Sequence, residues 1–251
     1  MGRPAAAHKI EMMPKKLWIP AAAVIALVAL GGAGAYAYFF SGLRTSPSNL
    51  ALGSPSPTSA TTTASPANGG TWQISTGSLV GYRVKEQFVG QSSAHEAVAR
   101  TGDVSGTVSI SQSGPTYEMN SATITVQLAN LTSQDSVAGY NVTNRDRIVQ
   151  RSLDVSSYPT AVFKASNVAL PAGVETGQTV TVSVPGQLTV HGVTKDVTAT
   201  LQLRVSGGTA QIAGSIATNM TDFGVQPPTI GFTTVQPAVT VEFSLNLAQA
   251  A

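Results

Sequence analysis

The sequence predicts an all-β fold, an antiparallel sandwich or closed barrel with one short helix, behind an N-terminal transmembrane helix. Three observations lead to this prediction. Short runs in which apolar and polar residues alternate fill the chain from Thr71 onward, and these runs are rich in β-branched residues. A long apolar run without charge lies near the N-terminus. The length of 251 residues allows one large or two small domains, with an apolar content of 42%.

The charges are few and unevenly placed. Five basic residues and one acidic residue precede residue 71, whereas nine basic and eleven acidic residues follow, so the net charge changes from +4 to −2. The basic character of the chain therefore belongs to its N-terminal part, and the folded part offers no electrostatic argument for binding nucleic acid. The absence of cysteine excludes disulfides, thiolate metal sites and a thiol nucleophile.

Residues 17–40 form an uncharged, mainly apolar run that would be about 36 Å long as a helix, enough to cross a bilayer with some tilt. Basic residues are more frequent before this run than after it, which places the basic segment 1–16 in the cytoplasm and the rest of the chain outside. This predicts a single-pass signal-anchor helix in the cell membrane. The alternative is a secreted protein cleaved near Ala37, because Ala35-Tyr36-Ala37 has the form of a cleavage site.

Residues 41–70 are dominated by Ser, Thr, Pro, Ala and Gly. Such a stretch has too few large apolar side chains to offset the entropy of ordering it, so it is expected to be a disordered linker. Its predicted role is that of a spacer, because it would hold a folded domain at a distance from the membrane.

Residues 71–251 form the predicted folded domain. Its alternating runs have Thr, Ser, Gln and Glu on one face, which is typical of antiparallel strands with one buried face. Ser206-Gly207-Gly208-Thr209 is a tight hairpin signal, and residues 142–153 fit a short helix. The clearest alternating runs are residues 79–84, 104–110, 124–128, 180–184 and 239–247.

Several stretches of this domain, in order, are similar to one family. Gly186-Gln-Leu-Thr-Val-His-Gly-Val-Thr-Lys195 resembles the most specific hairpin of the YceI-like family of exported lipid-binding proteins. Arg145-Asp146, Tyr158-Pro159 and Asp222-Phe223-Gly224 resemble further motifs of that family. The resemblance covers nearly all of residues 71–247. It implies a lipocalin-like, eight-stranded antiparallel barrel that holds a long isoprenoid chain and performs no catalysis.

Counting the alternation inward gives an almost wholly apolar wall. Such a wall favours an alkyl or prenyl chain over charged metabolites, since burying each methylene contributes about 0.8 kcal/mol. The residues alone fit a barrel filled by its own side chains equally well. The resemblance favours a ligand. The predicted cavity wall is Tyr82, Val84, Phe163, Leu188, Val190, Ala199, Leu201, Val241 and Phe243, and Ala161 and Val197 also count as inward.

Other polar residues fit structural roles better than chemical ones. His191 lies at a hairpin turn and is expected to bond turn backbone, and His8, His95 and His191 lack the spacing of a metal site. Arg145, Asp146 and Arg147 could pair across the barrel mouth or contact a ligand headgroup, but a solvated helix face is the commoner explanation for such a run and is the one expected here. Asp222-Phe223-Gly224 is interpreted as a strand-end turn in which Phe223 plugs the barrel.

The inward positions offer only the Tyr82 hydroxyl as a polar group, so catalysis is not expected, and no metal or cofactor is predicted apart from a bound isoprenoid lipid. The predicted function is that of a membrane-anchored, extracytoplasmic protein that sequesters or carries a long apolar chain, with a lipophilic small molecule as its partner. The alternative is a ligand-free envelope or surface interaction module with a filled barrel core.

Overall fold

A computed structural model describes residues 44–53, 69–89, 93–137, 141–231 and 233–250. The predicted cytoplasmic segment 1–16 and the predicted span 17–40 lie outside these residues. Within the described stretches, no helix is long and apolar enough to cross a bilayer.

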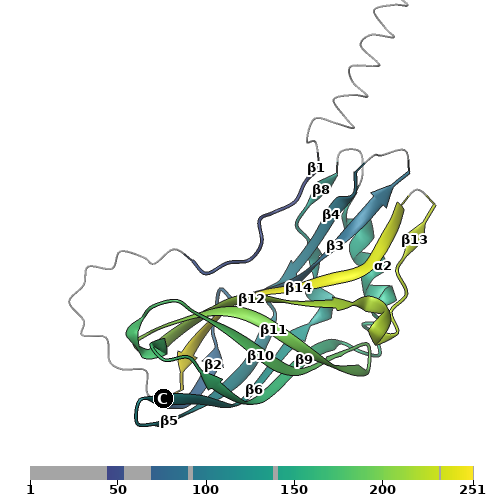
Figure 1. The fold of residues 1–251 in the computed structure, drawn as a ribbon. Helices are drawn as coiled ribbons and strands as arrows, with labels where there is room; N and C mark the ends of the chain where they lie inside the picture. The colour runs from purple at the N-terminus through teal and green to yellow at the C-terminus, as the bar shows by residue number, and fades with distance from the viewer. Residues whose placement is uncertain (1–43, 54–68, 90–92, 138–140, 232, 251) are drawn as a thin grey trace, which may run out of the picture. The chain divides into compact units, whose positions relative to one another are not determined.

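Strands dominate the described chain (Figure 1). The long strands carry apolar residues at alternate positions, as the sequence predicts; in β10, Val182, Val184 and Leu188 are buried whereas Thr181 and Ser183 are exposed. The strands are β1 (Arg44–Thr45), β2 (Gly70–Ile74), β3 (Leu79–Phe88), β4 (His95–Thr101), β5 (Val104–Ser113), β6 (Thr116–Gln127), β7 (Thr132–Ser133), β8 (Ser136–Val137), β9 (Thr160–Leu170), β10 (Val180–Val190), β11 (Val193–Ser206), β12 (Thr209–Asn219), β13 (Thr229–Ile230) and β14 (Thr233–Gln249). The helices are α2 (Thr143–Ser152) and the short 3-10 turns η2 (Leu128–Asn130), η3 (Val174–Thr176) and η4 (Met220–Phe223).

Eight strands of the described chain close an antiparallel barrel. Their order is β12-β11-β10-β9-β6-β5-β2-β14, and β14 pairs back onto β12. The predicted all-β, eight-stranded antiparallel barrel is therefore confirmed. The predicted hairpin at Ser206–Thr209 joins β11 to β12. Closure leaves an interior that the inward side chains of every strand share.

The long strand β14 pairs with two strands, β2 and β3, along the same edge. Its last residues pair with β2, and the stretch Thr233–Ser244 pairs with β3, which continues through β4 to β7. The register shifts between Val235 and Val239, around Pro237. Proline has no N–H for the ladder and is tolerated at such an irregularity, where the strand can bend. The wall therefore extends beyond the closed ring at the β3–β4 end.

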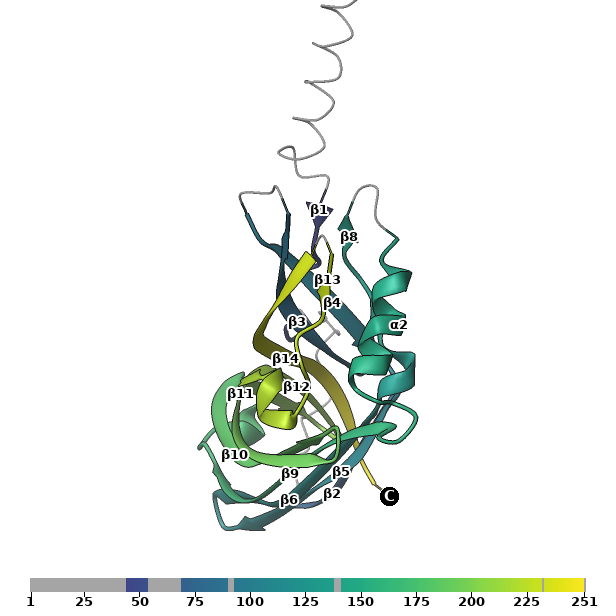
Figure 2. The ribbon, with the colours of Figure 1, turned by 90° about the vertical axis from the view of Figure 1, so that its right-hand side faces the viewer.

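Helix α2 packs beside this extended wall (Figure 2). The Asn141 side chain accepts a hydrogen bond from the Thr143 backbone N–H at 3.0 Å near the helix start. The prediction of a solvated Arg145-Asp146-Arg147 face is wrong in part, because Arg145 is 4% exposed. Arg147 is exposed, as predicted. The helix thus points a cation inward, and its partners lie on other elements.

Residues 44–53, which we call the strap, run along the outside of the barrel. β1 pairs with β8, and the backbone carbonyls of Pro47 and Ser48 accept hydrogen bonds from the Arg83 guanidinium at 2.7 and 2.6 Å. The expectation of a disordered linker from residue 41 to residue 70 is therefore wrong for the strap. Composition missed it because backbone atoms and polar side chains such as Thr45 and Ser46, and not apolar side chains, make the contacts.

Candidate ligand-binding cavity

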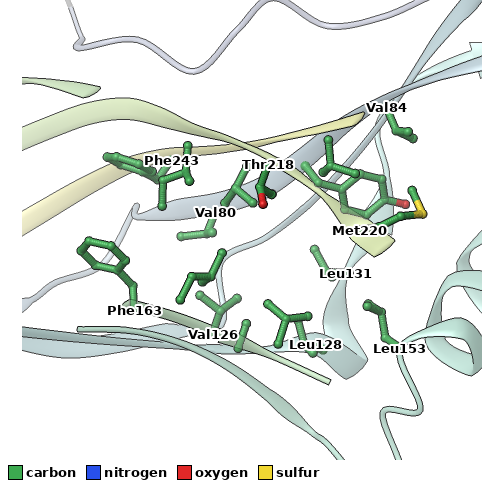
Figure 3. A pocket seen from close by; sticks show the side chains of 18 of the residues that line it. Val80, Val84, Val126, Leu128, Leu131, Leu153, Phe163, Thr218, Met220 and Phe243 are labelled. Carbon is green, nitrogen blue, oxygen red and sulfur yellow. The ribbon is translucent and has the colours of Figure 1, made fainter. Parts of the chain in front are cut away.

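A cavity of about 280 Å³ lies inside the barrel, between the walls that β3, β6, β9, β10, β11, β12 and β14 contribute. All nine residues of the predicted wall line it, and so does Ala161. Val197 instead packs against the hydrophobic core. Figure 3 shows Val126 and Leu128 on one side of the cavity and Val80 and Phe243 on the other. A two-residue period thus places these side chains, and their contact with a ligand stays a prediction.

A second space of about 80 Å³ lies at the β2 end of the barrel, and residues such as Val108, Met119 and Leu247 line both spaces. Trp72 lines this second space and is 4% exposed. Its indole nitrogen is buried and has no hydrogen-bond partner among the described residues. The apolar interior therefore continues along the barrel beyond the main cavity.

Phe223 contributes to one side of the cavity from η4 and is 2% exposed. Gly224 follows it in the left-handed conformation with φ 73°, which glycine adopts without a steric penalty. The interpretation of Asp222-Phe223-Gly224 as a strand-end turn therefore agrees with the structure. Leu153 and Met220 lie together at one end of the cavity (Figure 3).

His191 does not fix its own hairpin. It has a positive φ of 51°, and its Nδ1 lies 3.2 Å from the carbonyl oxygen of Phe223. Its ring also meets the Tyr158 ring edge-on, with centroids 5.0 Å apart. His191 therefore connects the β10–β11 turn to the η4 turn that carries Phe223, a structural role reached through a longer-range contact than expected.

The cavity also has polar residues that the inward count missed. Glu86 and Arg145 line it, so the expectation that Tyr82 alone offers a polar group is wrong. Glu86 lies on the extended wall, where the alternation of β3 is irregular, and Arg145 comes from α2. The complete set of lining residues with polar side chains is Tyr82, Glu86, Arg145, Ser152, Thr218 and Thr233.

Arg145 belongs to a buried ion cluster with Glu86, Asp135 and His95. Its Nη1 lies 2.8 Å from Asp135 Oδ1, and its Nη2 lies 2.9 Å from Glu86 Oε2. His95 Nε2 lies 2.7 Å from Asp135 Oδ2, and Asp135 Oδ1 also accepts a hydrogen bond from the Val98 backbone N–H. All four residues are at most 5% exposed. Buried charges persist only when they are paired in this way.

The cluster changes the acidity of its members. Burial raises the pKa of Glu86 above its ordinary value, although Arg145 opposes this. Burial also acts to raise the pKa of Asp135, but the hydrogen bond to His95 and the charge of Arg145 outweigh it and lower that pKa. Burial raises the pKa of the Tyr82 hydroxyl, which keeps it a neutral donor.

His95 and Glu96 both lie on β4. Among the described residues, no group of three His, Cys, Asp or Glu side chains is arranged to hold a metal ion. A spacing rule could not have found the buried ion cluster, since its members come from β3, β4, α2 and the segment before β8.

A YceI-like domain model matches residues 72–247 of the chain. No curated protein matches. Among solved structures, a polyisoprenoid-binding domain from Saccharophagus degradans implicated in plant cell wall breakdown aligns with a TM-score of 0.50 and 15% identity, over 73% of this chain and 100% of that one. BcnA of Burkholderia cenocepacia aligns with a TM-score of 0.43 and 19% identity, over 66% of this chain and 95% of that one. A YCEI protein of Campylobacter jejuni aligns with a TM-score of 0.42 and 16% identity, over 67% and 86%.

The family match spans all eight strands of the barrel except the outermost residues of β2 and β14. The resemblance seen in the hairpin Gly186–Lys195 is thereby confirmed. The chain belongs to the YceI-like family.

Proposed function

We propose that this protein binds a long apolar chain of isoprenoid type, non-covalently, inside its barrel. The observation that carries the proposal is the apolar cavity of about 280 Å³ within a closed barrel, which shares lining residues with the smaller space beside Trp72. This volume is close to the lower end of the roughly 300–1,000 Å³ of small-molecule sites.

The driving force is hydrophobic. Each buried methylene contributes about 0.8 kcal/mol, so a chain that fills the cavity gains several kcal/mol before the cost of ordering it. The nine wall residues, from Tyr82 to Phe243, supply contact area and no directional chemistry. The alternative, a surface module with a filled core, has no use for this space.

The end of the cavity that Glu86 and Arg145 line, which we call the polar end, favours a lipid with a neutral headgroup. The buried ion cluster sets one guanidinium against two carboxylates, so with both carboxylates ionised it carries no net positive charge even when His95 is charged. A phosphate would meet Glu86 and Asp135 without a surplus cation. A hydroxyl or carbonyl group can instead exchange hydrogen bonds with Tyr82 or Thr218 at no electrostatic cost.

The proposed setting is the outer face of the cell membrane, with the signal-anchor helix at residues 17–40 and the barrel extracytoplasmic. The secreted alternative, cleaved near Ala37, leaves the binding function unchanged. We propose no catalytic residue, metal or cofactor. The role is sequestration or transport of the lipid.

Native mass spectrometry of the full chain, purified in mild detergent, tests the proposal. A stoichiometric added mass that organic extraction releases as a prenyl or other long-chain lipid is the expected result. A prenyl alcohol should then bind more tightly than a prenyl phosphate of equal length. Protein at its bare sequence mass that takes up neither compound would leave the ligand-free module as the better account.

Leu201 and Thr200 provide a matched pair on β11. Leu201 lines the cavity, whereas Thr200 is exposed. Leu201→Glu places a carboxylate in the cavity and should abolish binding, while Thr200→Glu should not. Leu201→Trp, which narrows the cavity without a charge, serves where Leu201→Glu fails to fold. Equal lipid occupancy in all three variants contradicts a site inside the barrel.

A further inference from the structure

The strap is fixed by a second ion cluster on the outside of the barrel. Glu242 accepts hydrogen bonds from Arg83 Nε and Arg100 Nε, both at 2.7 Å, and from the Leu50 backbone N–H at 3.2 Å. Arg100 Nη2 reaches the carbonyl of Ser48 at 2.6 Å. Arg83 and Glu242 are 5% and 2% exposed. Such buried, charge-assisted bonds hold backbone tightly, so the strap is part of the fold.

Docking of the strap shortens the tether between the barrel and the proposed span. A free linker over residues 41–70 would separate them by about 30 Å on average. The strap begins at Arg44, and only residues 41–43 lie between it and Phe40. Four residue steps reach at most about 14 Å. Residues 54–68 then lead from the strap back to β2 and contribute nothing to the reach.

The strap also begins at a defined end of the barrel, which we call the proximal end. Arg44 pairs with Val137 of β8 and donates hydrogen bonds to Ser93, beside the β3–β4 connection. Phe88 at the tip of β3 pairs with Thr233 at the start of β14. Figures 1 and 2 agree in placing β1, β8 and the ends of β3 and β4 together, away from the C-terminus.

The surface of the proximal end suits a bilayer. Val89 at the tip of β3 is 76% exposed, although most valines are buried. The described residues that meet here outside the strap contain no Asp, Glu, Lys or Arg, and Arg44 of the strap adds a cation, which lipid phosphates attract. These uncharged residues are 87–89, 93–94, 136–137, 229–231 and 233–235.

We infer that the strap holds the proximal end of the barrel against the membrane surface, so that the polar end of the cavity faces the bilayer. The buried ion cluster lies at this end, because Glu86 pairs with His95 across β3 and β4 and Asp135 directly precedes β8. A lipid would then move between bilayer and cavity without crossing open water. The inference rests on the proposed anchor at residues 17–40 and on the proposed lipid cargo.

Fluorescence quenching in vesicles tests the orientation. The chain has no native cysteine, so Val89→Cys and Gly208→Cys each give one labelling site in the full-length protein. Gly208 lies in the β11–β12 hairpin, whose Thr209 pairs with Ala248, about 50 Å along β14 from Thr233. With a quencher on phosphatidylcholine headgroups, the label at residue 89 should be quenched several-fold more strongly than the label at residue 208.

Two insertion variants distinguish a strap that fixes the orientation of the barrel from a flexible linker that does not. About ten Gly-Ser residues between Leu43 and Arg44 lengthen the tether, and should reduce the quenching difference toward equality. The same insertion between Gly53 and Ser54, beyond the strap, should leave the difference unchanged. Equal effects of the two insertions overturn the role of the strap.

Flotation of the vesicles after an alkaline wash measures independently whether the protein is anchored in the membrane. Protein that floats with its vesicles but shows equal quenching at residues 89 and 208 overturns the orientation and leaves the anchor and the lipid cargo intact. Protein that does not float overturns the anchor, and the orientation with it. Lipid found by native mass spectrometry in that protein would still support the cargo.

Discussion

The Nη2 atom of Arg145 lies 2.9 Å from Oε2 of Glu86, which joins α2 to β3 at the polar end of an apolar cavity. The same guanidinium holds Asp135 with two contacts from Nη1, at 2.8 and 2.9 Å. One cation thus compensates two buried carboxylates. The helix and the extended wall of β3 and β4 are fixed together by this side chain.

Loss of Arg145 should destabilise the protein strongly. Arg145→Met keeps the length of the side chain but leaves Glu86 and Asp135 buried without their cation, which costs about 3–5 kcal/mol. Urea unfolding followed by circular dichroism measures the change. Arg147→Met on the exposed side of α2 is the control and should cost less than about 0.5 kcal/mol.

Adding Glu86→Gln to Arg145→Met should recover part of the loss, because one unpaired buried carboxylate disappears. The idea of a cooperative cluster is contradicted by Arg145→Met and Arg147→Met variants of equal stability. Strict additivity of the Glu86 and Arg145 substitutions would contradict it as well.

The turn after His191 should tolerate no side chain. Gly192 has φ 73°, and a Cβ there would lie 2.5 Å from Cε1 of Tyr158. Gly207 has φ 59° but has open space around its Cα. Gly207→Ala should therefore cost only the left-handed conformation, about 1–2 kcal/mol, whereas Gly192→Ala adds a clash and should cost more. Thermal unfolding of both variants decides this, and equal losses count against the Tyr158 contact.

Lowering the pH should reduce the free energy of unfolding through protonation of Glu242. Burial acts to raise its pKa, but hydrogen bonds from Arg100 and Arg83 outweigh this and lower the pKa below 4.5. An acid with a depressed folded-state pKa stabilises the fold fully above its unfolded pKa, and this stability is lost as the pH falls through the folded pKa. Glu242→Gln should therefore show a flatter free energy of unfolding between about pH 3 and pH 5 than the unsubstituted protein.

The contribution of Glu86 to the pH dependence of the unfolding free energy should have the opposite sign. Its pKa is raised above 4.5, so the folded state takes up a proton more readily and gains stability as the pH falls through the folded pKa. Glu86→Gln removes this gain, and its unfolding free energy should fall more steeply with acid. A matching response of Glu86→Gln and Glu242→Gln to pH would show that the two carboxylates do not differ as described.

The barrel and its apolar wall were predictable because a two-residue period determines which side chains face inward. Leu188, Ala199 and Phe243 line the cavity for this reason alone. The buried ion cluster was not predictable, since Glu86 and Arg145 are 59 positions apart and meet only when α2 packs on the wall. In the sequence, an Arg-Asp-Arg run looks the same whether its helix face is solvated or contributes to a buried ion cluster.

The strap escaped prediction for a different reason. Its residues have the composition of a disordered linker, and Leu50 and Leu52 are only half-buried. The buried stabilising contacts join its backbone to Arg83, Arg100 and Glu242, and composition does not report backbone contacts. A sequence pattern finds an element when the element's own side chains stabilise it.

Filling the cavity should stabilise the empty protein and weaken lipid binding. Val126 lines the cavity from β6, and Thr123 on the same strand is exposed. Val126→Phe replaces empty space with contacts, which commonly adds about 0.5–2 kcal/mol of stability, while it takes room from a chain and should weaken its binding by about tenfold or more. Thr123→Phe should change neither quantity. Unfolding of lipid-free protein and titration with a prenyl alcohol measure the two effects. Opposite signs in one variant arise only where the ligand competes for that space, so a Val126→Phe protein that gains stability and binds lipid with unchanged affinity would place the ligand elsewhere.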